Sequence, residues 1–207
     1  ATVHAVGIIM KEIVFATNNA HKLKEFRSML GKDWHVLSLA DIGCHDDIPE
    51  TADTFEGNAL QKAMFVAERY GRCNVVADDS GLCVDALDGA PGVFSARYAG
   101  EGHDSEANNA RLLAELDGIA DRHAHMATAM VFLADAASEP ITAVGKIEGE
   151  ITYGPQGSGG FGYDCLFRPT GWEKTFAEVD DQAKNAVSHR ARAVKALVAR
   201  LFESSLL

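Results

Sequence analysis

The sequence predicts an α/β fold, and three of its features support this prediction. Short apolar runs typical of buried strands recur along the chain. Segments with apolar residues three and four positions apart, typical of amphipathic helices, follow the first runs and close the chain. The length of 207 residues suffices for one substantial domain, with room for two lobes around a cleft. We therefore expect a single unit over residues 1–207, in which residues 1–7 form a start extension or a disordered segment.

The composition is that of an ordinary soluble globular protein, with 47% hydrophobic and 24% charged residues. A formal net charge of -11 argues against binding to DNA or RNA polymers, although a local basic cluster can still hold a small anion. No run is long enough for a membrane-spanning helix, and the first residues lack a signal-peptide pattern. The cysteines have no metal-site spacing, so we expect reduced, mostly buried thiols in a cytoplasmic protein: Cys44, Cys73, Cys83 and Cys165.

The first strand is expected at Ile13–Ala16, followed by a polar turn and a helix that ends at Gly31. Free N–H groups at the start of such a helix, together with Lys22, can bind an anion. The alternative is that Thr17 or Asn18 only caps the helix and Lys22 is solvated.

A second strand is expected at Trp34–Leu39, and Thr54 can cap a following helix. Glu50 precedes this helix and becomes a candidate Mg²⁺ ligand if it lies opposite Asp79, because Mg²⁺ in proteins is often held by one or two carboxylates. Asn58 and Lys62 are four residues apart and share one helical face, a position that is usually solvated.

The stretch Val75–Tyr98 is the most informative part of the chain. Val75–Ala77 resembles a buried strand that brings Asp78, Asp79 and Ser80 to its end, after which Gly81 turns the chain. Adjacent carboxylates at such a position are costly unless a metal ion or a lysine lies against them, or unless the turn is solvated.

The next segments are expected to form a tight turn, a helix and a hairpin. Arg97 follows the turn at residues 89–92, and a helix starts at Asp104 or Ser105. Two long strands at 125–134 and 141–151 are expected to pair antiparallel. His123 and His125 share a strand face without a third ligand, so we interpret them as structural.

The glycine-rich stretch at residues 154–164 ends in two aromatic residues, Phe161 and Tyr163. This pattern suits a backbone that approaches a flat ligand on which a ring stacks, or else an ordinary loop with Phe161 in the core. The last segment, 181–206, is expected to be helical. Basic residues near its start oppose the helix dipole, and such conflicts tend to mark functional sites: Lys184, His189 and Arg190.

Five segments in order resemble the non-standard purine nucleoside triphosphate pyrophosphatases, the inosine triphosphatase-like family. They are TNNAHK at 17–22, ETADTFEGNALQKA at 50–63, ADDSGLCVDALDGAPGVFSARYAG at 77–100, GSGGFGYD at 157–164 and AKNAVSHR at 183–190. One departure is Gly57, where the family commonly has an acidic residue, which weakens the case for Glu56 as a ligand.

The resemblance implies an elongated α/β fold with a central mixed β-sheet flanked by helices, a substrate cleft between two lobes, and a homodimer. It also implies Mg²⁺-dependent hydrolysis of ITP, dITP and XTP between the α- and β-phosphates. The products are a nucleoside monophosphate and pyrophosphate, and the reaction cleanses the nucleotide pool.

The family's site residues carry over as follows. The resemblance implies that Asp79 and Lys62 are catalytic and that the metal site comprises Glu50, Asp79 and Asp78. The expected substrate contacts are Thr17, Asn18, Asn19, Ala20, His21 and Lys22 for the triphosphate, Asn58, Ser80 and Arg97 nearby, and Phe161, Gly162, Tyr163, Asp164, Lys184, His189 and Arg190 for the base and sugar.

Two other functions remain as alternatives. A Maf-like nucleotide pyrophosphatase would share the reaction but differ in base preference, and the stretches at 157–164 and 188–190 argue against it. A catalytically inactive nucleotide sensor would retain the cleft, which the intact Asp79, Glu50 and Lys62 disfavour.

Overall fold

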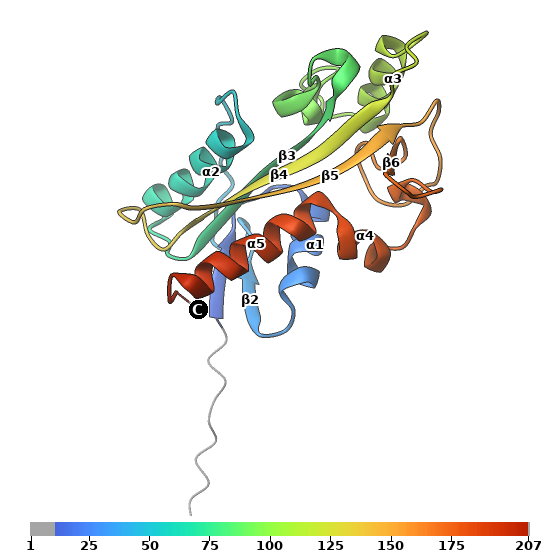
Figure 1. The fold of residues 1–207 in the computed structure, drawn as a ribbon. Coiled ribbons are helices and arrows are strands. Elements are labelled where there is room, and N and C mark those ends of the chain that lie inside the picture. Colours follow the sequence, from blue (N-terminus) through green and yellow to red (C-terminus); the bar gives the residue numbers. More distant parts are fainter. Residues whose placement is uncertain (1–10, 207) are drawn as a thin grey trace, which may run out of the picture.

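The protein is described by a computed structural model covering residues 11–206, which form an α/β fold around one mixed six-stranded sheet (Figure 1). The expected start extension at residues 1–7 lies outside the described residues. The strands are β1 (Lys11–Phe15), β2 (Trp34–Leu37), β3 (Val75–Val84), β4 (His123–Leu133), β5 (Ile141–Ile151) and β6 (Phe167–Pro169). The helices are α1 (Ala20–Leu30), α2 (Phe55–Tyr70), α3 (Ser105–Glu115), α4 (Asp181–Val187) and α5 (His189–Glu203), with 3₁₀ turns η1 (Asp85–Leu87), η2 (Gly92–Arg97) and η3 (Phe176–Glu178).

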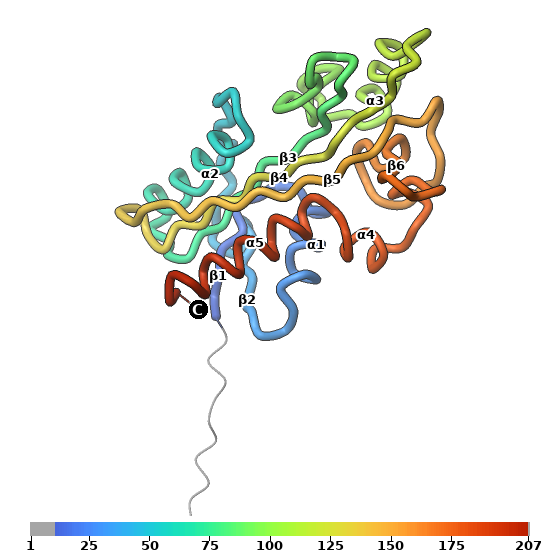
Figure 2. Tube along the Cα trace, viewed as in Figure 1, coloured from blue at the N-terminus to red at the C-terminus, as the bar shows by residue number. Residues whose placement is uncertain are grey.

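The sheet has the order β2-β1-β3-β4-β5-β6. β1 runs parallel to β2 and β3, whereas β3, β4, β5 and β6 pair antiparallel. The long strands β3, β4 and β5 extend from one end of the molecule to the other and give it an elongated shape (Figure 2). The expected mixed sheet flanked by helices is therefore confirmed.

Three apolar clusters pack on this sheet. α2 covers one face through residues such as Ala63 and Val66, while α5 and Phe26 of α1 cover the other face at the same end. At the far end a third cluster joins Leu112 of α3 to Phe167 and Phe176. The molecule thus has two packed ends that share the long strands. No helix among residues 11–206 is long and apolar enough to cross a membrane.

β3 differs from the sequence prediction. The strand does not end at Ala77, and Gly81 does not turn the chain, because β3 pairs with β4 continuously from Val75 to Val84. Gly81 marks a close approach instead: a Cβ there would lie 2.4 Å from the carbonyl oxygen of Gly92. Asp78 and Asp79 consequently lie within the strand and point to opposite faces of the sheet.

β1 is short, and this leaves one edge of β3 free. The pairing of β1 with β3 covers only Val75 and Val76. Among residues 11–206 no strand continues along this edge over Ala77–Gly81. η2 packs against β3 from Gly81 onward, where Leu82 N donates to Ser95 Oγ at 2.9 Å. The free edge lies between the two packed ends, beside the turn that follows β1.

Two other sequence expectations are corrected. The last segment is not one helix: Ser188 ends α4 and caps α5, its hydroxyl accepting from Ala191 N at 3.1 Å. The cysteines are free, but they are not mostly buried: Cys44 is buried, Cys73 is exposed, and the other two are intermediate.

The start of α5 lies directly on β5, because Gly145 has no side chain. A Cβ at Gly145 would lie 2.0 Å from the carbonyl oxygen of His189 and 2.4 Å from Ala193 N. We predict that Gly145→Ala lowers the free energy of unfolding by about 1–3 kcal/mol, because the α5 backbone must move. Chemical denaturation measures this, with Gly154→Ala as the control, since a Cβ at Gly154 meets open space. Equal stability of the two variants would contradict the close contact between β5 and α5.

Candidate active site

A cavity of about 630 Å³ lies at the free edge of β3, a size typical of small-molecule sites. It is lined by residues from the turn after β1, from α2, from β3, from η2 and the loop after it, from the glycine-rich loop and from α4 and α5. Most of the expected site residues line it: Thr17, Asn18, Asn19, Lys22, Glu50, Lys62, Asp79, Ser80, Arg97, Phe161, Gly162, Tyr163, Asp164, Lys184, His189 and Arg190.

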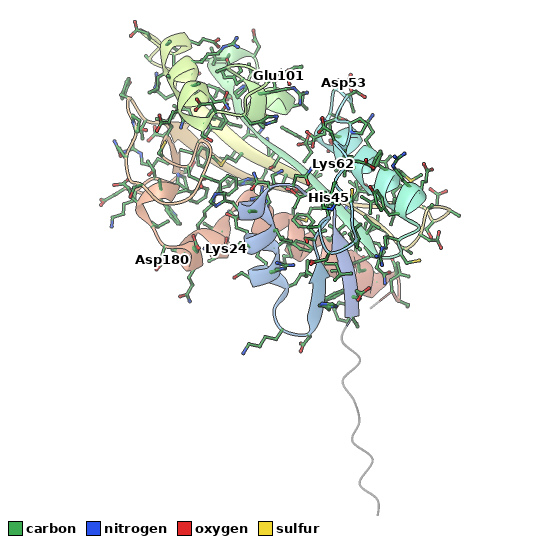
Figure 3. All side chains as sticks on the ribbon, turned by 180° about the vertical axis from the view of Figure 1, so that it is seen from behind. Lys24, His45, Asp53, Lys62, Glu101 and Asp180 are labelled. Atoms are coloured by element: carbon green, nitrogen blue, oxygen red, sulfur yellow. The ribbon has the colours of Figure 1, made fainter. Side chains whose placement is uncertain are left out.

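One side of the cavity holds two carboxylates and a lysine. Asp79 accepts from Asn58 Nδ2 at 3.0 Å, and Lys62 Nζ donates to Glu50 in a short ion pair. α2 positions both Asn58 and Lys62 over β3, with Lys62 near the centre of the molecule (Figure 3). Asn58 is buried and Lys62 is 7% exposed, so the face they share is not solvated as such a pair usually is.

Burial raises the pKa of Asp79 above its ordinary value of 3.8, and Glu50 adds to this effect. Lys62, Lys22 and the hydrogen bond from Asn58 oppose the shift without reversing it. A further cation beside Asp79 and Glu50 would therefore be favoured. Two carboxylates suit Mg²⁺, which in nucleotide sites is usually held by one or two carboxylates plus substrate phosphates. Among residues 11–206, no three His, Cys, Asp or Glu side chains form a group that could hold a metal ion.

Some polar groups of the turn after β1 form hydrogen bonds within the turn and the first turn of α1. Asn19, rather than Thr17 or Asn18, caps α1, and its Oδ1 accepts from His21 N at 3.0 Å and from Lys22 N at 3.1 Å. Thr17 Oγ1 accepts from Asn19 N. Lys22 is not solvated, because its Nζ lies 3.2 Å from Asp78 Oδ2.

The other side of the cavity is built on a buried network of charges. Asp78 contacts Lys22 and, at 3.2 Å, Arg190 Nε. Arg190 also pairs closely with Glu25 and donates to Ser80 Oγ at 2.9 Å. Lys184 Nζ donates to Glu25 Oε1 at 2.8 Å and to Asp164 Oδ2 at 2.6 Å. Three cations and three carboxylates thus join α1, β3, the glycine-rich loop, α4 and α5.

The ionisation of this network follows from its pairing. Burial alone would raise the pKa of Asp78, but Lys22 and Arg190 outweigh it and hold the pKa well below its usual range. Burial raises the pKa of Asp164, and Lys184 opposes that rise only in part. Burial and the neighbouring cations Arg190, Lys184 and Lys22 lower the pKa of His189 well below 6.5, so its imidazole is neutral at pH 7.

Phe161 provides an aromatic surface beside these cations. Its ring centroid lies 4.6 Å from Lys184 Nζ and 5.8 Å from Arg190 Cζ, and its N–H donates to Asp164 Oδ2 at 2.9 Å. The buried His189 Nδ1, by contrast, has no hydrogen-bond partner within residues 11–206. Buried polar atoms in native proteins are rarely left unpaired, so a bound ligand is a suitable partner.

Four expected site residues do not line the cavity: Ala20, His21, Asn58 and Asp78. Asn58 supports Asp79 from behind, whereas both oxygens of Asp78 are occupied by Lys22 and Arg190. The position of Asp78 therefore does not support the expected metal role. We exclude it from the metal ligands that we propose.

Several lining residues were missed by sequence reasoning. Glu101 and His103 belong to the loop before α3, Ser105 is the first residue of α3, and Asp47 belongs to the irregular segment before α2. Glu25, which bridges Lys184 and Arg190 without lining the cavity, was also missed, because these partners lie far from it in the sequence. The sequence offered one signal for a buried charge here: Glu25 directly precedes Phe26, which is buried.

Comparison with known proteins identifies the family. The pattern of the Ham1 family matches residues 13–200. A dITP/XTP pyrophosphatase of Porphyromonas gingivalis is 49% identical over 189 residues, 91% of this chain and 96% of that protein. One of Flavobacterium psychrophilum is 46% identical over 187 residues, 90% of this chain and 97% of that protein.

Solved structures of similar proteins have the same fold. The Staphylococcus aureus Ham1 protein superposes with a TM-score of 0.83 at 39% identity, covering 94% of this chain and 100% of that chain. A nucleoside-triphosphatase / dITP/XTP pyrophosphatase of Mycobacterium abscessus gives a TM-score of 0.73 at 41% identity, covering 90% and 98%. The agreement of sequence motifs, fold and cavity residues leads to one conclusion: this chain belongs to the Ham1 family.

Proposed function

We propose that this protein hydrolyses the non-standard purine nucleotides ITP, dITP and XTP to the monophosphate and pyrophosphate, with Mg²⁺ as cofactor. The observation that supports this most is the division of the cavity at the free edge of β3. One side offers Lys62, Glu50 and Asp79, which suit a polyphosphate and a metal ion. The other offers Phe161 beside Lys184 and His189, which suits a base. The dITP/XTP pyrophosphatases among the relatives support the same reaction.

The chemistry assigned to these residues follows from their charges. Asp79 and Glu50 would hold Mg²⁺, which would neutralise and orient phosphate oxygens. Lys22 and Lys62 face the same cavity and offset the negative charge that the departing pyrophosphate carries. Asp79, directly or through an ordered water, takes a proton from the attacking water as the new bond to the α-phosphorus forms and the bond to the β-phosphate bridging oxygen breaks. As a carboxylate on the wall of the cavity, Asp79 is placed to accept this proton.

Base selectivity is proposed to depend on hydrogen-bond donors. The N–H groups of Gly162 and Tyr163 donate to no acceptor among residues 11–206, and both residues line the cavity. Lys184 and His189 add side-chain donors. These groups can donate to the O6 oxygen of hypoxanthine or xanthine, whereas the N6 amine of adenine would leave a donor unpaired. A site built for hydrogen bonds rejects such an analogue strongly.

We further propose, on the family resemblance alone, that the protein is a homodimer, acts in the cytoplasm and cleanses the nucleotide pool.

The function is tested by measuring pyrophosphate release with Mg²⁺ from ITP, dITP, XTP, dATP, dGTP and dTTP side by side. We expect strong turnover of the first three and little of the others, and loss of turnover when EDTA removes the metal. Activity centred on a pyrimidine nucleotide would contradict the base selectivity and favour a Maf-like enzyme. ITP binding without pyrophosphate release would favour a sensor.

We predict that Asp79→Asn lowers kcat for ITP by at least about 100-fold, because it removes both a proton acceptor and a metal ligand. The fold should persist, since asparagine has the same shape and can still accept from Asn58. Steady-state kinetics and thermal melting test both statements. The control is Asp53→Asn, which removes an exposed carboxylate before α2, outside the cavity (Figure 3). Near-normal turnover by Asp79→Asn would overturn its assigned role.

A further inference from the structure

His21 makes a contact that the proposed chemistry does not use. Its imidazole stacks on the ring of Phe161, with centroids 5.0 Å apart and an interplanar angle of 17°. His21 belongs to the first turn of α1, and Phe161 belongs to the glycine-rich loop. The contact therefore joins the segment after β1, on the phosphate side of the cavity, to the aromatic surface on the base side.

The position of His21 differs from that of its neighbours in the turn. Thr17, Asn19 and Lys22 line the cavity, whereas His21 does not and its side chain is exposed. Its N–H already donates to Asn19 Oδ1. Because Phe161 does line the cavity, His21 contacts that ring from outside the cavity. The stack therefore places the imidazole against Phe161, and His21 is not among the residues that line the cavity.

Phe161 is half-buried and belongs to none of the three apolar clusters described for residues 11–206. The glycines on either side, Gly160 and Gly162, have φ values of +66° and +60°, which suit a sharp local path of the backbone. The hydrogen bond from Phe161 N to Asp164 fixes the backbone but not the rotation of the ring. The cations Lys184 and Arg190 lie near the ring and constrain it only loosely. A flat group stacked on the ring limits that rotation more strongly.

Ion pairs hold α1 against the C-terminal part of the chain, and they fix the position of His21 on this helix. Lys24 Nζ lies 2.5 Å from Asp181 Oδ2 at the start of α4, where Figure 3 shows Lys24 beside Asp180. The buried Glu25, on the same helix, binds both Lys184 and Arg190. The first turn of α1 therefore keeps a fixed place relative to the residues around Phe161.

We propose that His21 is a positioning residue for nucleobase binding: it holds the Phe161 ring in the plane on which the purine stacks. This inference rests on the proposed function and adds to it a residue outside the cavity. Because stacked aromatic pairs contribute modestly, loss of the imidazole should weaken purine nucleotide binding by about two- to tenfold. The residue does not touch the phosphates, so binding of a ligand without a base should not change.

The experiment compares His21→Ala and His21→Phe with the wild-type protein. Calorimetry with Mg²⁺ measures the Kd of a non-hydrolysable α,β-imido analogue of ITP, and inhibition kinetics measure the Ki of inorganic tripolyphosphate. We expect His21→Ala to raise the Kd of the analogue and the KM for ITP by about two- to tenfold, with kcat and the tripolyphosphate Ki unchanged. His21→Phe keeps a stacking ring and should bind the analogue like the wild type.

His35→Ala serves as the matched control, because His35 is also an exposed histidine but pairs with Glu12 on β1, away from the cavity. Unchanged analogue binding by His21→Ala would overturn the inference. So would equal weakening of tripolyphosphate, which would place His21 in the phosphate cradle, or failure of His21→Phe to restore binding. If the wild-type protein binds no purine nucleotide, the proposed function fails first, and this inference fails with it.

Discussion

The rest of the structure depends on one constraint, a buried network of six charged side chains: Lys22, Glu25, Asp78, Asp164, Lys184 and Arg190. Taking such charges out of water is costly, and removal of one partner from a buried pair typically costs about 3–5 kcal/mol. Each charge here has an opposite partner, and the partners come from α1, β3, the glycine-rich loop, α4 and α5. The network therefore fixes these segments relative to one another, and it does so at the wall of the cavity.

The free edge of β3 lies beside this network, and the cavity at this edge has two sides of different chemistry. Successive residues of a strand point to opposite faces, so Asp78 enters the charge network while Asp79 faces Asn58 and Lys62 of α2. Ser80 returns to the first face and accepts from Arg190. Because β1 ends at Phe15, this edge of β3 borders the cavity instead of a neighbouring strand. A nucleotide can thus lie with its phosphates on one side of a single strand and its base on the other.

Much of the fold and of the candidate site could be predicted from the sequence. Apolar periodicity locates the strands and helices, and the five motifs of the family occur in their usual order. Thr54 caps α2 as predicted, and α3 starts at Ser105 with Asp104 as its cap, where the sequence left the start at either of the two residues. Local patterns could not show that β3 continues through Asp78 and Asp79, since charged residues within a buried strand are stabilised only by partners distant in sequence. The same limit hid Glu25, whose partners Lys184 and Arg190 lie far along the chain. The metal role of Asp78 and the phosphate contact of His21 came from the family resemblance, and neither residue lines the cavity.

A crystal structure of the protein with Mg²⁺ and a non-hydrolysable α,β-imido analogue of ITP tests the central claim most directly. The account predicts that hypoxanthine stacks on Phe161 within reach of Lys184. It also predicts that the phosphates lie between Lys22 and Lys62, with Mg²⁺ bound to Asp79 and Glu50. Phosphates bound at Lys184 and Arg190, or a base placed beside Lys62, would contradict the division of the cavity into two sides.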